Sequence, residues 1–310
     1  MDSSARGFGS MIGNLFPLLI FPYVIKMSHD HPQLGYTVGI CICAAIGFLC
    51  CMLSCRWTTE RFYHHEHHNP RHASNVRMSD ILHVLRNNRP FVALCLQGLV
   101  YSVGQYIGST LSIYMYRDIL GDVTYMSMAT IITMPLSFVF LAWAPKLTER
   151  FGMERTVRAT QLISAALYCL VFSVLLFTRT AIVYMLLIGL AQSFGGVTVL
   201  MQWALVGEAI DYNEMRTGKR AEGSIYGFFN LTRRIGQAIG ASAAVSLLSF
   251  IGYVPGAAAQ TDAVYLGIQV LVVLVPAALM VLCWLILKAI WNITPAIRDQ
   301  IAAFKETADS

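Results

Sequence analysis

Long apolar stretches, separated by short polar segments, repeat along nearly the whole chain of 310 residues. Each stretch holds about 20 or more mostly apolar residues, the length with which an α-helix crosses ~30 Å of hydrocarbon. Helices are expected because an open sheet would leave backbone groups unpaired in lipid. The pattern predicts an all-α polytopic membrane protein with eight transmembrane helices, at roughly 8–27, 35–55, 90–116, 122–144, 156–178, 181–207, 222–251 and 264–290.

The composition agrees with a membrane location. Hydrophobic residues make up 56% of the chain and charged residues 13%, whereas a soluble domain carries about 25% charged residues. The eight cysteines all lie in apolar stretches. Because they lack the paired spacing of a zinc site, we interpret them as small apolar side chains. We expect no resident metal and no cofactor.

The basic residues indicate the orientation in the membrane. The two ends of the chain, together with 56–89, 145–158 and 211–222, hold 17 Lys and Arg residues, while the alternate segments hold 3. Cytoplasmic segments carry this excess of positive charge. We therefore expect both termini to be cytoplasmic, and we do not interpret the net charge of +5 as a nucleic-acid footprint.

The segment 56–89 is the only long connection, and we expect it to be a cytoplasmic linker between two bundles. Two helices precede it in 1–55, six follow in 90–290, and 291–310 forms a cytoplasmic tail. Many transporters pair two six-helix halves, so this imbalance predicts that helices are missing from the front. The histidines in 64–72 could bind a divalent metal, but consecutive histidines make no preformed tetrahedral site. A solvated linker is the preferred interpretation.

The most informative polar stretch runs from 208 to 223. Glu208 and Asp211 are three positions apart at the end of the sixth predicted helix, so they share a face. We expect a cytoplasmic loop of mixed charge here. One interpretation is a solvated loop; the other is an inner gate, in which acids at a helix end pair with bases on a neighbouring helix.

A second polar group lies inside the seventh predicted helix. Asn230, Arg234 and Gln237 follow i, i+4, i+7 spacing and form one stripe. Arg234 lies 12 residues past Glu222, roughly 18 Å into the membrane. A charge at this depth costs at least ~2.5 kcal/mol and must face protein or water. We favour a substrate cavity over an arginine that only bridges helices; the sequence gives no partner for the neighbouring Arg233.

Other polar residues within the predicted helices suit a sugar, which needs hydrogen bonds to amides and an aromatic surface for its apolar face. Each of them alone is more readily explained as a helix-packing contact. They are Gln97, Tyr101, Gln105, Tyr106, Gln192, Gln202 and Trp203. The predicted helices contain no metal-ligand pair, nucleophile–base pair or Gly-rich phosphate loop, so we do not expect an enzyme.

The signature in 209–255 resembles one family. Residues 209–223 read Ala-Ile-Asp-Tyr-x-Glu-x3-Gly-x-Arg-x-Glu-Gly, and residues 233–238 read Arg-Arg-Ile-Gly-Gln-Ala. These motifs, with Ile-Gly-Tyr-Val-Pro at 251–255 and Asn-Arg-Pro at 88–90, are similar to those of the glycoside–pentoside–hexuronide:cation symporters. This branch of the major facilitator superfamily includes the melibiose and glucuronide carriers. The resemblance covers nearly the whole chain.

The resemblance implies twelve helices in two halves, with alternating access around a central sugar site. The chain would then hold the last two helices of the N-terminal half and the complete C-terminal half. Arg6 matches a family arginine implicated in the sugar site, and Arg234 lies where the family usually has a lysine of the cavity. Arginine keeps the charge but does not release a proton. The acids that coordinate the cation belong to the missing helices.

These observations lead to one preferred hypothesis. The protein is expected to be a sugar or glycoside symporter of the bacterial inner membrane, driven by Na⁺ or H⁺ and present as an N-terminally truncated form. Four residues would bind substrate, and three would belong to the inner gate. The substrate residues are Arg6, Asn230, Arg234 and Gln237, and the gate residues are Glu208, Asp211 and Arg220. The alternative is a transport-inactive truncated membrane protein or an interaction partner.

Overall fold

The computed structural model describes residue 13 and residues 32–57, 84–122, 124–178, 180–218, 222–257 and 259–309. These residues form helices joined by short turns, and the described part contains no strand. The chain divides into two compact units, Met1–Asn75 and Val76–Ser310. The protein is all-α, as the apolar pattern predicts.

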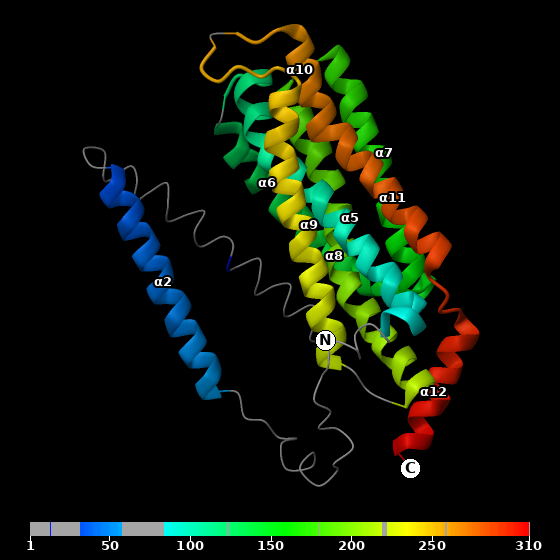
Figure 1. The fold of residues 1–310 in the computed structure, drawn as a ribbon. Coiled ribbons are helices and arrows are strands. Elements are labelled where there is room, and N and C mark those ends of the chain that lie inside the picture. Colours follow the sequence, from blue (N-terminus) through cyan, green and yellow to red (C-terminus); the bar gives the residue numbers. More distant parts are fainter. Residues whose placement is uncertain are drawn as a thin grey trace. The chain divides into compact units, whose positions relative to one another are not determined.

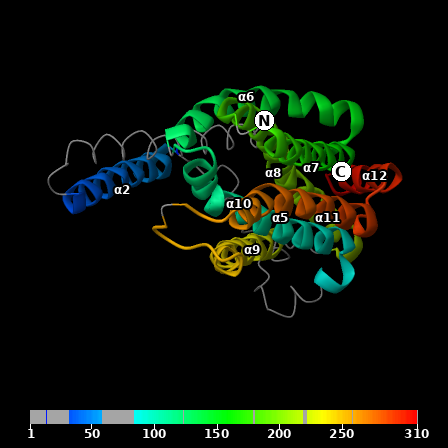
Figure 2. The same cartoon turned by 90° about the horizontal axis from the view of Figure 1, so that it is seen from above.

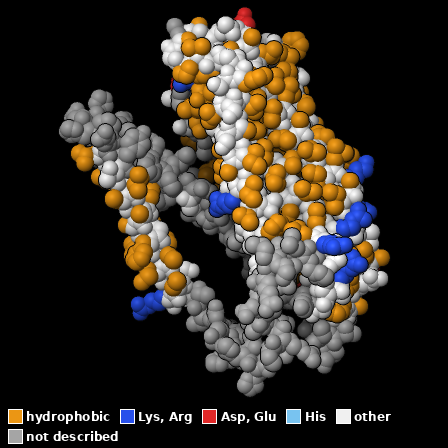
Figure 3. All heavy atoms as spheres, in the orientation of Figure 1, with side chains coloured by type: hydrophobic (Ala, Val, Ile, Leu, Met, Phe, Trp, Pro, Cys, Tyr) orange, Lys and Arg blue, Asp and Glu red, His pale blue; other side chains and the backbone are white. Residues whose placement is uncertain are grey.

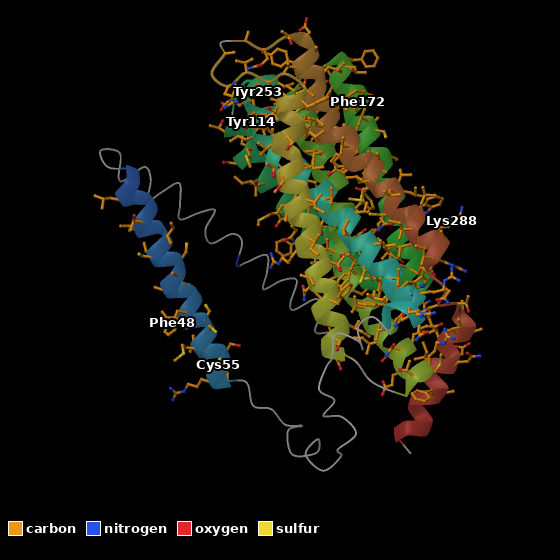
Figure 4. The ribbon with its side chains drawn as sticks, in the orientation of Figure 1. Phe48, Cys55, Tyr114, Phe172, Tyr253 and Lys288 are labelled. Carbon is orange, nitrogen blue, oxygen red and sulfur yellow. The ribbon has the colours of Figure 1, made fainter. Side chains whose placement is uncertain are left out.

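The described part of the first unit is one long helix, α2 (Pro32–Trp57). Its segment Thr37–Trp57 is long and apolar enough to cross a membrane. Most of its described side chains are exposed, including Phe48, 66% exposed and labelled with Cys55 in Figure 4. The predicted helix 8–27 lies outside the described residues, apart from residue 13.

The second unit consists of helices that run alongside one another, as two views at right angles show (Figures 1 and 2). The elements are α5 (Arg89–Tyr114), η1 (Met115–Ile119), α6 (Thr124–Phe151), α7 (Met153–Phe177), α8 (Ala181–Thr217), α9 (Glu222–Phe250), α10 (Asp262–Gln269), η2 (Val270–Leu274), α11 (Val275–Ile290) and α12 (Pro295–Asp309). Helix α5 packs against both α9 and α11, α7 and α6 pack against α8, and α10, η2 and α11 continue as one span.

Six of the described helices are long and apolar enough to cross a membrane. Helix α9 is not among them, although its 29 residues are sufficient for ~30 Å of hydrocarbon. It is too polar, because it carries Asn230, Arg233, Arg234 and Gln237. The predicted number of eight transmembrane helices is therefore not confirmed; the six apolar helices of the described residues agree with a multi-pass helical membrane protein.

Helix α8 corrects the predicted loop at 208–223. It has 37 residues and ends only at Thr217, where Gly218 adopts a left-handed conformation with φ 66° and its N–H bonds to the Glu214 carbonyl. A helix of this length spans about 56 Å, more than the hydrocarbon core. Its last turns therefore extend past the apolar layer as helix. Glu208 and Asp211 are helical, as their shared face requires, but the helix continues beyond them to Thr217.

Two short π-helical segments interrupt the long helices. The second, η2, is followed directly by α11, which has Pro276 in its first turn. Proline has no N–H to donate to the preceding turn, and a π-turn accommodates this loss by changing the hydrogen-bond register. The span from Asp262 to Ile290 thus stays helical through the proline.

Helices α5 and α9 approach one another closely. A Cβ atom at Gly236 would lie 2.6 Å from the Leu99 carbonyl oxygen, and one at Gly240 would lie 2.6 Å from the Val103 carbonyl oxygen. Only glycine fits at such a backbone contact. This contact fixes which face of α9 turns inward, and it thereby determines where the polar residues of α9 point.

The tail 291–310 contains a helix that the sequence did not predict. In α12 and the residues before it, Ile293 and Ile301 are buried, and Ile297 packs against the same core. The spacing of four residues puts these apolar side chains on one face of the helix. Figure 3 shows apolar side chains over much of the visible face of this unit, with most of the visible Lys and Arg in its lower half.

Candidate functional site

The polar stripe predicted on α9 lies on the face that turns away from α5. Thr232, Gly236 and Gly240 are buried, whereas Asn230 and Arg234 are exposed and Gln237 is half-buried. The Arg234 Nη1 atom donates a hydrogen bond of 3.0 Å to Gln237 Oε1. The structure therefore brings Arg234 and Gln237 together and places Asn230 one turn away.

Arg233 has different surroundings from Arg234. Its guanidinium carbon lies 5.4 Å from the centroid of the Trp203 ring on α8. The side chain is half-buried, and its Nε atom has no hydrogen-bond partner. This partner is not predictable from the sequence, because a cation–π contact between residues 30 positions apart has no local pattern.

Neither arginine has an acidic partner in the described part of the chain. The ion pairs that the structure describes are Arg117–Asp118, Arg158–Glu154 and Arg298–Glu208, and all of them lie near helix ends. Two guanidinium groups thus occupy the middle of α9, and no carboxylate of the described residues lies within ion-pair distance of them. The site presents hydrogen-bond donors and positive charge to any ligand.

Several candidate sugar ligands are buried in the packing of α5 on α8. Gln97 and Gln202 are fully buried, and Gln202 Nε2 donates to Gln97 Oε1 at 2.7 Å. The Tyr101 hydroxyl donates to the Gly195 carbonyl at 3.0 Å. For these three residues the structure supports the helix-packing interpretation. Gln105 remains exposed on α5, and Gln192 remains exposed on α8.

Near the C-terminal end of α8, the structure pairs one predicted gate residue with α12. Arg298 Nη2 lies 3.1 Å from Glu208 Oε2. Asp211 lies less than one turn further along α8 and is half-buried. Arg220 and Arg6 lie outside the described residues. The partner Arg298 could have been found only by recognising the amphipathic spacing of Ile293, Ile297 and Ile301.

The opposite end of the unit holds a compact polar cluster. Arg117 binds Asp118 at 2.7 Å and donates to the Tyr253 hydroxyl, which in turn donates to Asp118 at 3.1 Å. The rings of Tyr253 and Tyr114 meet edge to face with centroids 5.0 Å apart (Figure 4). Partial burial and the bond to Asp118 raise the pKa of Tyr253, so the phenol stays protonated. The cluster joins the end of α5 to the turn after α9.

A cavity of about 270 Å³ lies between the end of α7 and the start of α10. Its lining residues are Leu175, Leu176, Phe177, Thr178, Asp262, Tyr265, Leu266 and Gln269. None of the predicted site residues lines it. The candidate site is therefore the exposed polar face of α9 with its neighbour Trp203.

Comparison of the amino-acid sequence with known proteins identifies the family of this chain. The family model described as "MFS/sugar transport protein" matches residues 3–293. The uncharacterized symporter YjmB of Bacillus subtilis (strain 168) is 30% identical over 96% of this chain and 63% of its own length. The glucuronide carrier protein homolog of Escherichia coli (strain K12) is 28% identical over 92% of this chain and 60% of its own.

A putative sulfoquinovose importer of Salmonella typhimurium (strain LT2) is 26% identical over 98% of this chain and 63% of its own length. The chain thus spans somewhat less than two thirds of the length of these relatives. The match over 3–293 covers nearly all of the chain, including every predicted site residue. The chain belongs to the MFS/sugar transport protein family.

Proposed function

We propose that the protein containing this chain carries a sugar or glycoside across the membrane in symport with a cation, Na⁺ or H⁺. The observation that carries the proposal is the exposed stripe of Asn230, Arg234 and Gln237 in the middle of a long helix of a sugar transport protein. Polar and charged groups at membrane depth are costly and are retained at substrate and ion pathways.

The charge of the site points to the substrate class. Arg234 supplies an exposed positive charge without a described carboxylate partner, and the other polar residues of its stripe, Asn230 and Gln237, are amides. A guanidinium binds a carboxylate or sulfonate through two parallel hydrogen bonds. The names of two relatives, a glucuronide carrier homolog and a putative sulfoquinovose importer, refer to anionic sugars. We propose a sugar with an anionic group as the substrate.

The mechanism we propose is alternating access. The unit from α5 to α11 would form one half, and α2 with the helix predicted at 8–27 would belong to the other half, connected by the cytoplasmic linker 56–89. Glu208, Asp211 and Arg220 would belong to the inner gate. Because arginine does not release a proton at ordinary pH, proton coupling would not pass through Arg234. The expected location is the bacterial inner membrane, with both termini cytoplasmic.

The experiment that tests the proposal is uptake by bacterial cells expressing the longest reading frame that includes these 310 residues. Radiolabelled methyl β-D-glucuronide and methyl β-D-glucoside differ at one carbon, which is a carboxylate in the first and a hydroxymethyl group in the second. We expect uptake of the glucuronide to exceed that of the glucoside at least tenfold and to fall when the Na⁺ or H⁺ gradient is removed.

Each outcome has a distinct meaning. Equal uptake of the two methyl glycosides would refute the anionic substrate but not sugar transport. Uptake that is unaffected by removal of both ion gradients would refute symport. Failure to take up a panel of labelled glycosides and uronides, with the protein present in the membrane fraction, would refute the proposed function and favour a membrane protein without transport activity.

A further inference from the structure

Helices α5, α8 and α9 meet at one level of the bundle. In the interior of the bundle, the buried Gln97 of α5 accepts a hydrogen bond from the buried Gln202 of α8. The next residue of each helix, Gly98 and Trp203, faces α9. Trp203 of α8 thus contacts α9 next to the substrate stripe of Asn230, Arg234 and Gln237.

Arg233 reaches Trp203 by crossing Gly98. A Cβ atom at Gly98 would lie 3.4 Å from Arg233 Cγ and 3.0 Å from Phe229 Cε2. The absence of a side chain on α5 therefore leaves room for the stem of Arg233. From there the guanidinium extends to 5.4 Å from the centroid of the Trp203 ring. The side chain of Arg233 on α9 thereby contacts both α5 and α8.

One stripe of α9 surrounds the Trp203 ring. Tyr226, Phe229 and Arg233 are spaced at i, i+3 and i+7 and lie on the same side of the helix. The Tyr226 ring is stacked on Trp203 with centroids 6.1 Å apart, and the Phe229 ring meets it edge to face at 5.4 Å. The Arg233 Nε atom has no hydrogen-bond partner, and the ion pairs among the described residues do not include Arg233. The indole ring stabilises the guanidinium charge through this cation–π contact.

The next residue, Arg234, points elsewhere. Adjacent residues of an α-helix are about 100° apart around its axis, and Arg234 is hydrogen-bonded to Gln237 on the exposed face. A rotation of α9 by one residue would exchange the positions of the two guanidinium groups. The contact of Arg233 with Trp203 adds to the glycine contacts of α9 with α5 in opposing that rotation, and it thereby helps to determine which arginine faces the substrate.

We propose that Arg233 is a positioning residue: it acts through Trp203 to fix the rotation of α9, so that Arg234 faces the substrate while Arg233 does not touch it. The proposal rests on the proposed function, because the effect on affinity requires a substrate at Arg234. Helix α8 continues from Trp203 to Glu208 five residues later, about 7.5 Å along the helix. The same contact thus connects the substrate site to the gate end of α8.

The first experiment tests the contact without any substrate. The chain contains five tryptophans, so replacing Trp57, Trp143, Trp284 and Trp291 by Phe leaves Trp203 as the single tryptophan, whose fluorescence is excited selectively. The protein in lipid nanodiscs is titrated with acrylamide. We expect Arg233→Gln to increase the quenching of Trp203 at least twofold, and Arg233→Lys and the control Arg234→Gln to change it little. Equal quenching in the parent, Arg233→Gln and Arg234→Gln would overturn the proposed contact.

The second experiment is a double-mutant cycle on the affinity for methyl β-D-glucuronide. We expect Arg233→Gln and Trp203→Leu each to weaken binding about tenfold, and the double variant to be little weaker than either, because both remove the same contact. Arg233→Lys should restore affinity to within about threefold, since lysine also binds an aromatic face. Arg234→Gln should abolish binding both in the wild type and together with Trp203→Leu.

Independent effects would overturn the proposal. If the losses of Arg233→Gln and Trp203→Leu multiply, or if Arg233→Lys is as weak as Arg233→Gln, then Arg233 does not act through Trp203. If the wild type binds no glucuronide, the proposed function fails at its substrate, and the positioning role in binding fails with it; the quenching result then still decides whether Arg233 holds the Trp203 ring.

Discussion

Two adjacent arginines on α9 are stabilised in different ways. Arg233 packs on Gly98 and places its guanidinium over an indole ring, while Arg234 is exposed and shares a hydrogen bond with Gln237. A guanidinium is weakly hydrated and stacks on aromatic rings, so Arg233 is tolerated in a half-buried place. The charge of Arg234 has no such compensation, and it is the one that is available to a ligand.

Arg234 should be required for substrate binding. We expect Arg234→Ala to reduce the affinity for methyl β-D-glucuronide at least 100-fold, because the paired hydrogen bonds to the carboxylate are lost. Membrane insertion should be unaffected, since removing a charge at this depth lowers the cost of insertion. Binding by equilibrium dialysis and the amount of protein in the membrane fraction are measured together.

The matched control is Ile239→Ala, at a side chain of the same helix that is 48% exposed. This variant removes apolar surface but no polar group, and its affinity should stay within about twofold of the wild type. Wild-type affinity of Arg234→Ala would return Arg234 to a structural role. Loss of the protein from the membrane would contradict the predicted ease of insertion.

The part of the candidate site that depends on helical spacing could be predicted from the sequence. Asn230, Arg234 and Gln237 share a face because of the 3.6-residue period, and the structure places all three away from the α5 contact. The partners of Arg233 and Gln97 were not predictable, since Trp203 and Gln202 are distant in the chain and only packing brings them close. The assignment of these residues to a substrate stays a prediction.

At the scale of the elements, the close contact between α5 and α9 keeps the polar stripe of α9 on the face that turns away from α5. Gly236→Ala should destabilise the protein by about 1–3 kcal/mol, because the added methyl group would lie 2.6 Å from a backbone oxygen of α5 and the helices would have to separate. Thermal unfolding in detergent measures the change.

The control for this prediction is Gly227→Ala. Gly227 lies on the same helix and has nothing within 4 Å of an added Cβ atom. Alanine favours helix over glycine by up to about 1 kcal/mol, so this variant should be as stable as the wild type or slightly more stable. Equal behaviour of the two alanine variants would contradict the close approach of α5 and α9.

Helix α12 is held to α8 by Arg298 and Glu208, whose side chains are 30% and 17% exposed. A partly exposed ion pair contributes about 0.2–1 kcal/mol, a small term for the whole protein but a large one for a 15-residue helix. Arg298→Glu should therefore increase limited proteolysis between α11 and α12 several-fold. The double variant Glu208→Arg/Arg298→Glu should restore protection, and failure to restore it would exclude the ion pair as the cause.

The element boundaries show what hydropathy can and cannot predict. The apolar pattern gave the core of every described long helix, but α8 continues for ten residues past the predicted end at 207. Its extension is polar and helical, and hydropathy reports only the part that lipid covers. Helix α12 was missed for the same reason, because its apolar residues pack on protein and recur every four positions.

At the scale of the whole molecule, the orientation in the membrane is a prediction that the two ends of α6 can test. Asp122 precedes this helix and Glu149 lies near its end; both are exposed. The asymmetry of 17 to 3 basic residues places Glu149 in the cytoplasm. In a cysteine-free background, Asp122→Cys should react with an impermeant maleimide in intact cells, and Glu149→Cys should react only after lysis. The reverse pattern would invert the topology.

Coupled transport requires both an ion site and two helical bundles, and we expect that the 310-residue chain alone does not perform it. Coupling requires a site at which the ion changes the free energy of the sugar-bound states. A hard cation prefers several oxygen ligands, usually with a carboxylate among them. In the sequence, the eight apolar stretches carry acids only at their ends, so no carboxylate is available at the depth of Arg234. Alternating access also needs two bundles that rock around the site, and α2 with one further predicted helix is a poor substitute for a six-helix half.

The purified chain is reconstituted in liposomes, and a Na⁺ or H⁺ gradient is imposed in the presence of labelled methyl β-D-glucuronide. We expect no accumulation above equilibrium, because neither gradient has a site through which to act. Accumulation abolished by an ionophore would contradict this expectation and would show that the amides, hydroxyls and arginines of these helices suffice to couple an ion to a sugar.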